Sequence, residues 1–176
     1  PAEGNAGDLA GSVNGQLVNG VSFAVGKVGL AFSFSGNSTR VDLGRVAPGT
    51  RWSLEAWVNL STLPGGRRAI FGCHYDCRDW SLVMNEGVWG LNVGYGSCVK
   101  IVSSGVRAVA GTWTHLVGTY DGTNATIYVN GEAMKTEDAA VNYTGSSSGL
   151  WIGGSLCCGE WITGLVDEPS LYNRAL

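Results

Sequence analysis

The segment TWTHLVGTYDGTNATIYVNGEAM, residues 112–134, constrains the fold more than any other part of the chain. Two runs of alternating apolar and polar residues, WTHLVGTY and ATIYVN, flank Asp121-Gly122, and Asn130-Gly131 follows the second run. Such alternation indicates half-buried strands. Asp-Gly and Asn-Gly readily adopt the positive φ angles of tight hairpin turns. The segment therefore predicts two consecutive β-hairpins.

Similar short runs make up the rest of the chain. No stretch of ten residues shows the 3.6-residue period of a helix, while 28 Gly, 7 Trp and 6 Tyr suit short strands joined by tight turns. A length of 176 residues fits one domain. We therefore expect residues 1–176 to form a single all-β domain, a jelly roll or two-sheet sandwich. Besides the hairpins, the expected strands are 29–36, 39–44, 53–60, 67–73, 80–85, 88–95, 98–104, 150–155 and 162–172.

Charge and hydropathy exclude several partner classes. A net charge of −3, with only 14% charged residues, gives no reason to expect nucleic acid or an anionic membrane as partner. No run of 18 apolar residues exists, so we expect no membrane insertion. Pro1 is not an initiator methionine, and the chain is expected to be a piece of a larger protein.

Several blocks of sequence carry a family resemblance. The ordered blocks GDLAGSVNGQLVNGVSF, GKVGLAFSFSG, RVDLG, SLEAWVNL, GTWTHLVGTYDGTNATIYVNGE, LWIGG and ITGLVDEPSLYNRAL resemble the laminin-G-like branch of the concanavalin A-like lectin/glucanase superfamily. The resemblance implies a jelly-roll sandwich of two curved antiparallel sheets. It also implies an extracellular module of a surface protein or polysaccharide-degrading enzyme. Such modules are typically non-catalytic, and others in the branch bind proteins.

Catalysis is not expected. The retaining glucanases of this superfamily carry Glu-x-Asp-x-x-Glu or Glu-x-Asp-x-Glu on one strand, which points the carboxylates into one cleft. This chain lacks either pattern. Glu132, Glu137 and Asp138 have the wrong spacing, and Asp167 and Glu168 are adjacent, so on a strand they would face opposite sides.

The resemblance also implies a structural Ca²⁺ ion. Related domains often hold one between an early Asp-containing loop and an Asp near the C-terminal strand, and Asp8, Asn14 and Asp167 occupy matching positions. Hard oxygen ligands with intervening glycines suit Ca²⁺. The alternative is that Asp8 and Asn14 cap turns while Asp167 accepts backbone hydrogen bonds.

A glycan site is expected on loops. Aromatic faces stack on the C–H patches of sugars, and Asp, Glu or Arg side chains bond to hydroxyls. An arginine could also bind the carboxylate or sulfate of an acidic polysaccharide. Against this, Trp80 alternates with Leu82 and Met84, which indicates a buried face. The concave sheet face, with Trp89 or Asn92, is the alternative site. The expected loop residues are Tyr75, Asp76, Arg78, Trp80, Tyr95, Glu160 and Trp161.

The five cysteines indicate disulfides rather than metal or redox chemistry. Neither a paired zinc-knuckle spacing nor C-x-x-C is present. Alternate loops of up-and-down strands lie at the same end of a sheet, which places Cys77 beside Cys98. A second bond from Cys73 to Cys157 or Cys158 is expected if loop 156–161 closes over the same end.

Two functions stay open from the sequence. The first is a secreted or surface-displayed, calcium-stabilised module that binds a polysaccharide or other glycan. The second is an adhesion or structural module whose loops contact a protein or another copy of the chain.

Overall fold

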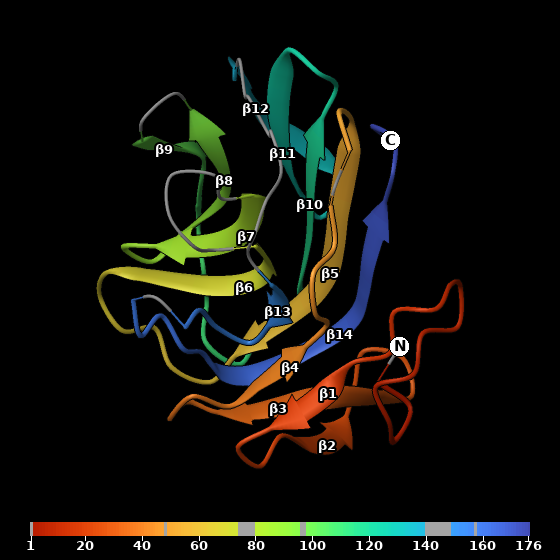
Figure 1. Cartoon of the computed structure of the whole chain (residues 1–176). Coiled ribbons are helices and arrows are strands. Elements are labelled where there is room, and N and C mark those ends of the chain that lie inside the picture. Colours follow the sequence, from red (N-terminus) through yellow and green to blue (C-terminus); the bar gives the residue numbers. More distant parts are fainter. Residues whose placement is uncertain (1, 48, 74–79, 96–97, 140–148, 157) are drawn as a thin grey trace.

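Two stacked antiparallel sheets make up the molecule (Figure 1). The structure is a computed structural model that describes residues 2–47, 49–73, 80–95, 98–139, 149–156 and 158–176, without the side chains of Tyr95, Cys98 and Val99. Within these residues it contains no helix, and hence none that could cross a membrane. The expected all-β jelly roll is confirmed.

Each sheet has seven strands. Sheet A has the order β1-β4-β13-β6-β7-β8-β9, formed by Gln16–Val18, Arg40–Asp42, Leu150–Ile152, Arg67–Cys73, Trp80–Asn85, Val88–Tyr95 and Cys98–Arg107. Sheet B has the order β12-β11-β10-β5-β14-β3-β2, formed by Glu132–Asp138, Asn124–Val129, Thr114–Tyr120, Trp52–Leu60, Thr163–Tyr172, Leu30–Ser35 and Ser22–Val25.

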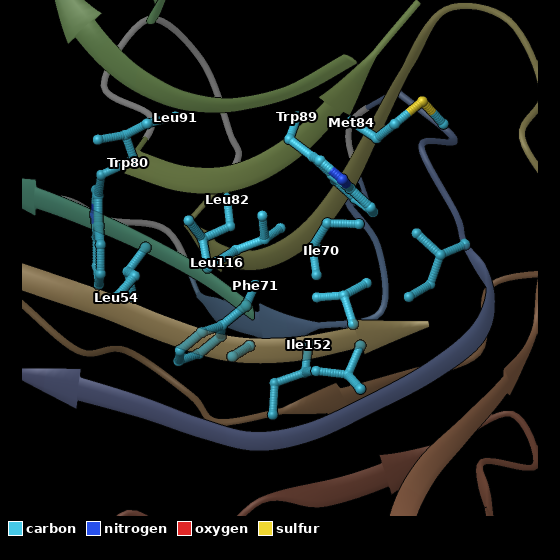
Figure 2. Packing of buried hydrophobic residues seen from close by; sticks show 14 of the residues in the cluster. Leu54, Ile70, Phe71, Trp80, Leu82, Met84, Trp89, Leu91, Leu116 and Ile152 are labelled. Carbon is cyan, nitrogen blue, oxygen red and sulfur yellow. The ribbon is translucent and has the colours of Figure 1, made fainter. Parts of the chain in front are cut away.

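The core fills the space between the sheets because alternate residues of each strand point inward. In β7, Trp80, Leu82 and Met84 face the core, and Figure 2 shows them in the cluster of buried residues that also contains Leu54 and Leu116 of the opposite sheet. All five of these side chains are fully buried. Each Å² of buried apolar surface contributes about 25 cal/mol to the free energy of unfolding, so the burial of this core is the main contribution to stability.

The expected hairpins are present as β10, β11 and β12. Gly122 and Asn130 have the positive φ angles, 100° and 52°, that the two turns require. β6, β7 and β8 have the expected bounds, and the other expected strands differ only at their ends. The short edge strands β1 and β2 were not expected, because their exposed residues show no alternation of apolar and polar residues.

Candidate functional site

The loop that follows β13 forms the best described candidate site. Its base is closed by hydrogen bonds from Gly153 N to Ile70 O (2.8 Å) and from Ile162 N to Gly153 O (3.1 Å). Glu160 O accepts a further hydrogen bond from Ala69 N (3.1 Å), so the loop lies along the first half of β6. Main-chain hydrogen bonds at Gly153 and Glu160 therefore hold the two ends of the loop against sheet A.

An ion pair fixes the end of this loop. The Glu160 carboxylate lies 2.8 Å (Oε1 to Nε) from the guanidinium of Arg67, the first residue of β6. The side chain of Glu160 is only 9% exposed and that of Arg67 24%. A buried carboxylate in direct contact with a guanidinium is well paired, and it holds both side chains in one position.

The indole of Trp161 lies next to this pair along the chain and is half-buried. One part of its ring packs over Gly154, where any Cβ would collide with Cε3 and Cζ3 of the ring. Gly154 thus supports the indole from one side, and the partly exposed remainder is available to a ligand. An aromatic surface beside fixed polar groups is what sugar recognition requires.

Two of the expected ligand residues, Glu160 and Trp161, therefore both belong to this loop. Arg67 was missed as the partner of Glu160. No local sequence signal could have found it, because the contact arises from the antiparallel pairing of β13 with β6, 77 or more residues away in the chain.

Trp80 was wrong as a sugar-stacking residue. It is 0% exposed and packs against Trp52, with ring centroids 5.6 Å apart. The alternation of Trp80 with Leu82 and Met84 correctly indicated a buried face, since all three residues belong to the core.

The remaining expected ligand residues lie outside the described part of the structure. Tyr75, Asp76 and Arg78 belong to segment 74–79, and the side chain of Tyr95 is not described. β6 begins at Arg67 and ends at Cys73, so Glu160 lies at the opposite end of β6 from the end that residue 74 follows.

The outer face of sheet A carries a continuous row of cross-strand neighbours. The row runs Asp42, Trp151, Gly72, Ser81, Asn92 from β4 to β8. Ser81 and Asn92 are 0% exposed and Trp151 is 6% exposed. This face is therefore not an open platform, which favours the partly exposed Trp161 as the ligand-contacting aromatic residue. Trp89, suggested for this face, instead lies in the core.

The expected disulfide from Cys73 to Cys157 or Cys158 is wrong. Cys73 is not part of a disulfide, and it ends β6 on the core face with 1% exposure. Cys158 is disulfide-bonded, to a residue outside the described side chains. The Cys77–Cys98 bond stays a prediction, since neither side chain is described.

The turn at Asp8 does not fit a cation. Asp8 Oδ1 accepts hydrogen bonds from the N–H groups of Ala10 and Gly11, both 2.9 Å, and Oδ2 accepts one from Val13 (3.0 Å). The expected partner Asn14 uses its Oδ1 to accept a hydrogen bond from Asp8 N (3.0 Å). These N–H groups, with that of Val13 foremost, hold the pKa of Asp8 below its usual value.

The carboxylate of Asp167 is occupied in the same way. It is fully buried, and its Oδ2 accepts hydrogen bonds from Lys27 N (2.8 Å) and Val28 N (2.9 Å) while Oδ1 accepts one from Glu168 N (2.9 Å). N–H groups that point at both oxygens leave them poorly disposed to bind Ca²⁺ as well. Across the described residues, no three His, Cys, Asp or Glu side chains gather that could hold a metal ion. The contacts of Asp8, Asn14 and Asp167 therefore favour the alternative interpretation as turn caps and backbone acceptors, and the calcium ion stays a prediction.

Several solved structures share this fold. Domain 4 of AbnA, a GH43 extracellular arabinanase from Geobacillus stearothermophilus solved in complex with arabinotriose, has a TM-score of 0.85 and 22% identity, covering 98% of this chain and 88% of that domain. The binding domain of Paraclostridial Mosquitocidal Protein 1 has a TM-score of 0.79 and 14% identity, covering 96% of this chain and 46% of that one.

A third similar structure is the heptameric SAP-like pentraxin from Limulus polyphemus. It has a TM-score of 0.63 and 18% identity, and the match covers 82% of this chain and 76% of that one. At these identities the likeness establishes the fold alone. A search of curated proteins finds no match to this chain.

The sequence itself matches one family over residues 34–176, which is most of its length and extends from β3 through the last described strand, β14. The two-sheet architecture agrees with this match. The chain belongs to the laminin G family of the concanavalin A-like lectin/glucanases superfamily.

Proposed function

We propose that the chain is a non-catalytic, extracellular carbohydrate-binding module that binds glycans at Trp161 and the neighbouring Arg67–Glu160 pair. The observation that carries the proposal is the partly exposed indole of Trp161, seated on Gly154 next to a fixed ion pair. The arabinotriose complex of the similar arabinanase domain supports the same ligand class.

The charge of the site favours a neutral glycan. The positive charge of Arg67 is already balanced by Glu160 at 2.8 Å, so the pair offers hydrogen-bonding groups without a net charge. An acidic polysaccharide would gain little from a guanidinium that already has a carboxylate partner. A neutral polysaccharide can stack on the indole and place hydroxyls beside the pair.

The described carboxylates support a non-catalytic role. Glu160 pairs with Arg67, and Asp167 accepts backbone N–H groups. Glu55 is bonded to His115 and Tyr172 on the outer face of sheet B. Each of these three carboxylates is thus already engaged by other groups of the fold.

Affinity electrophoresis in gels that contain neutral polysaccharides, arabinan among them, tests the proposal. We expect the protein to be retarded and Trp161→Ala to lose the retardation. Trp113→Ala is the matched control, because Trp113 is also a half-buried tryptophan but precedes β10 of sheet B. Equal retardation of the two variants would place the site elsewhere.

The absence of retardation of the unaltered protein on every polysaccharide would refute glycan binding itself. The adhesion alternative stays a prediction, and sedimentation velocity over a range of concentrations would detect self-association.

A further inference from the structure

A separate pocket of about 670 Å³ lies between the two sheets, beneath the N-terminal segment. Its inner wall comes from both sheets, with Phe32 of β3, Val41 of β4 and Phe71 of β6 among the lining residues. Residues 6–13 cover it from outside. This segment belongs to the red N-terminal part of the chain, which leads into β1 in Figure 1. The pocket shares no residue with the Trp161 site.

A bulge in β14 is next to the pocket. The pairing of β14 with β5 shifts between Asp167 and Ser170, and Glu168 at the shift has a φ of 47°. Glu168 and Pro169 both line the pocket. A bulge bends its strand and disrupts the local pairing, so β14 departs from regular packing where the pocket lies.

The cover of the pocket is held in place without a ligand. The three N–H groups bonded to the Asp8 carboxylate fold residues 8–13 into a compact turn. Gly15 N donates a hydrogen bond to Ala6 O (2.7 Å), and Gly15 sits so close to Val41 that a Cβ would collide with that side chain. The pocket is therefore preformed and not a gap that collapses, and its volume lies in the range of small-molecule sites, roughly 300–1,000 Å³.

The lining of the pocket is mostly apolar with a few acidic residues. The lining residues with ionisable side chains are Glu3, Asp8, Glu168 and Tyr172. The hydroxyl of Tyr172 donates a hydrogen bond to Glu55 on the outer face of sheet B, so the charged residues of the lining are the three acidic ones. No Lys, Arg or His is among the lining residues. Both oxygens of Asp8 are already bonded, and Glu3 Oε1 accepts a long hydrogen bond from Leu30 N (3.3 Å). Glu168 has no side-chain hydrogen bond or ion pair within the described residues.

We propose that this pocket is a second ligand site, which takes one small molecule with an apolar body and a basic nitrogen. The apolar body fills the space between Phe32, Val41 and Phe71. The ammonium group lies toward Glu168, whose carboxylate pairs with no cation among the described residues. An anion of the same shape is disfavoured because the charged residues in the described lining are all acidic.

Three probes of one shape and different charge test the proposal: 4-phenylbutylamine, 4-phenylbutanol and 4-phenylbutyrate at pH 7. Binding is measured by titration calorimetry and by chemical-shift changes in the full chain. We expect the amine to bind at least tenfold more tightly than the alcohol, and the carboxylate not to bind at millimolar concentration. Equal affinity of the amine and the carboxylate, or no binding of the amine, would overturn the proposal.

Two variants test whether the amine binds in this pocket or elsewhere on the protein. Ala10→Trp adds bulk from an exposed residue that lines the pocket, and we expect it to abolish binding of the amine. Glu168→Gln removes the charge and should reduce the preference for the amine over the alcohol to less than threefold. Val109→Trp, at a residue 59% exposed and outside the pocket, is the matched control and should leave binding unchanged. Amine binding that survives both Ala10→Trp and Glu168→Gln would refute this site.

Discussion

The imidazole of His115 and the carboxylate of Glu55 meet across neighbouring strands of sheet B, with 2.9 Å between Nε2 and Oε1. The second oxygen of Glu55 accepts the hydroxyl hydrogen bond of Tyr172, also at 2.9 Å. The Trp57 ring lies beside the imidazole, with centroids 4.9 Å apart, and Lys27 Nζ lies 4.6 Å from the centroid of Trp57. Side chains on β5, β10 and β14 are thus linked through Glu55.

Replacement of Glu55 by Gln should lower the pKa of Tyr172 toward its ordinary value. The hydrogen bond to the Glu55 carboxylate, followed by burial, raises that pKa because the ionised phenolate would lose the bond and face a negative charge. A raised pKa in the folded state gives stability that is present below the unfolded pKa near 10 and is lost as the pH rises through the folded value.

Ultraviolet titration of phenolate absorbance measures this effect. The difference between the unaltered protein and Tyr172→Phe isolates the Tyr172 signal from the other tyrosines. Glu55→Gln should shift that signal to lower pH and should weaken the alkaline loss of stability. An unshifted Tyr172 signal in Glu55→Gln would show that Glu55 is not the cause.

Replacement of Trp80 by Ala should unfold or strongly destabilise the domain. The fully buried indole contacts Trp52 between the sheets, and truncation of a buried aromatic residue costs about 3–5 kcal/mol of the free energy of unfolding. Urea denaturation followed by tryptophan fluorescence measures the loss. Trp161→Ala serves as the comparison and should cost much less, because that indole is only half-buried. A similar loss in both variants would contradict the different placement of the two residues.

The positions of β6, β7 and β8 and the two hairpins could be predicted from the sequence because alternation and turn residues are local signals. The location of the loop that carries Glu160 could not. It depends on β13 pairing with β6, a contact between strands far apart in the chain. The expected bond from Cys73 to Cys157 or Cys158 required loop 156–161 to close over the end of β6 that segment 74–79 follows, whereas Glu160 contacts Arg67 at the start of β6.

The calcium expectation stays a prediction, and the sequence could not decide it for a different reason. A short loop with Asp, Asn and glycines suits a metal site and a hydrogen-bonded turn equally well, since both use side-chain oxygens as acceptors. Only the positions of the backbone N–H groups around Asp8 and Asp167 distinguish the two. Those positions depend on the tertiary structure, and no residue pattern in the chain specifies them.

Removal of divalent ions should leave the stability unchanged. The carboxylates of Asp8 and Asp167 are occupied by N–H donors, so the fold as described has no need of Ca²⁺. Melting temperatures in EDTA and in excess CaCl₂ should agree to within about 1 °C, since an ion bound to the native state alone would raise the melting temperature. A melting temperature clearly higher in CaCl₂ than in EDTA would show that the native protein binds a stabilising Ca²⁺ ion.

Replacement of Asp167 by Ala should lower the free energy of unfolding more than the removal of divalent ions does. Its buried carboxylate accepts the N–H groups of Lys27, Val28 and Glu168, and a buried donor left without an acceptor costs about 1–3 kcal/mol. Asp167→Asn keeps one carbonyl oxygen and should recover part of the loss. Chemical denaturation of the two variants gives the comparison, and equal losses would show that the lost hydrogen bonds do not determine the effect.

Stability should fall in acid partly because of two turns. Asp121 Oδ1 accepts hydrogen bonds from Asn124 N (2.7 Å) and Thr123 N (2.8 Å) at the turn between β10 and β11, and these bonds lower the pKa of Asp121. Asp8 is held below its usual pKa by its own N–H donors. A lowered folded pKa gives stability that is present above the unfolded value near 4 and is lost as the pH falls through the folded value.

The variant Asp8→Asn with Asp121→Asn should therefore be less stable than the unaltered protein at pH 7, and the difference should shrink toward pH 2. Denaturation midpoints at the two pH values measure it. Glu132→Gln is the matched control because Glu132 is exposed at the next turn, between β11 and β12, and its side chain makes no hydrogen bond or ion pair within the described residues. A difference that stays constant between pH 7 and pH 2 would mean that the two carboxylates contribute through shape and not through charge.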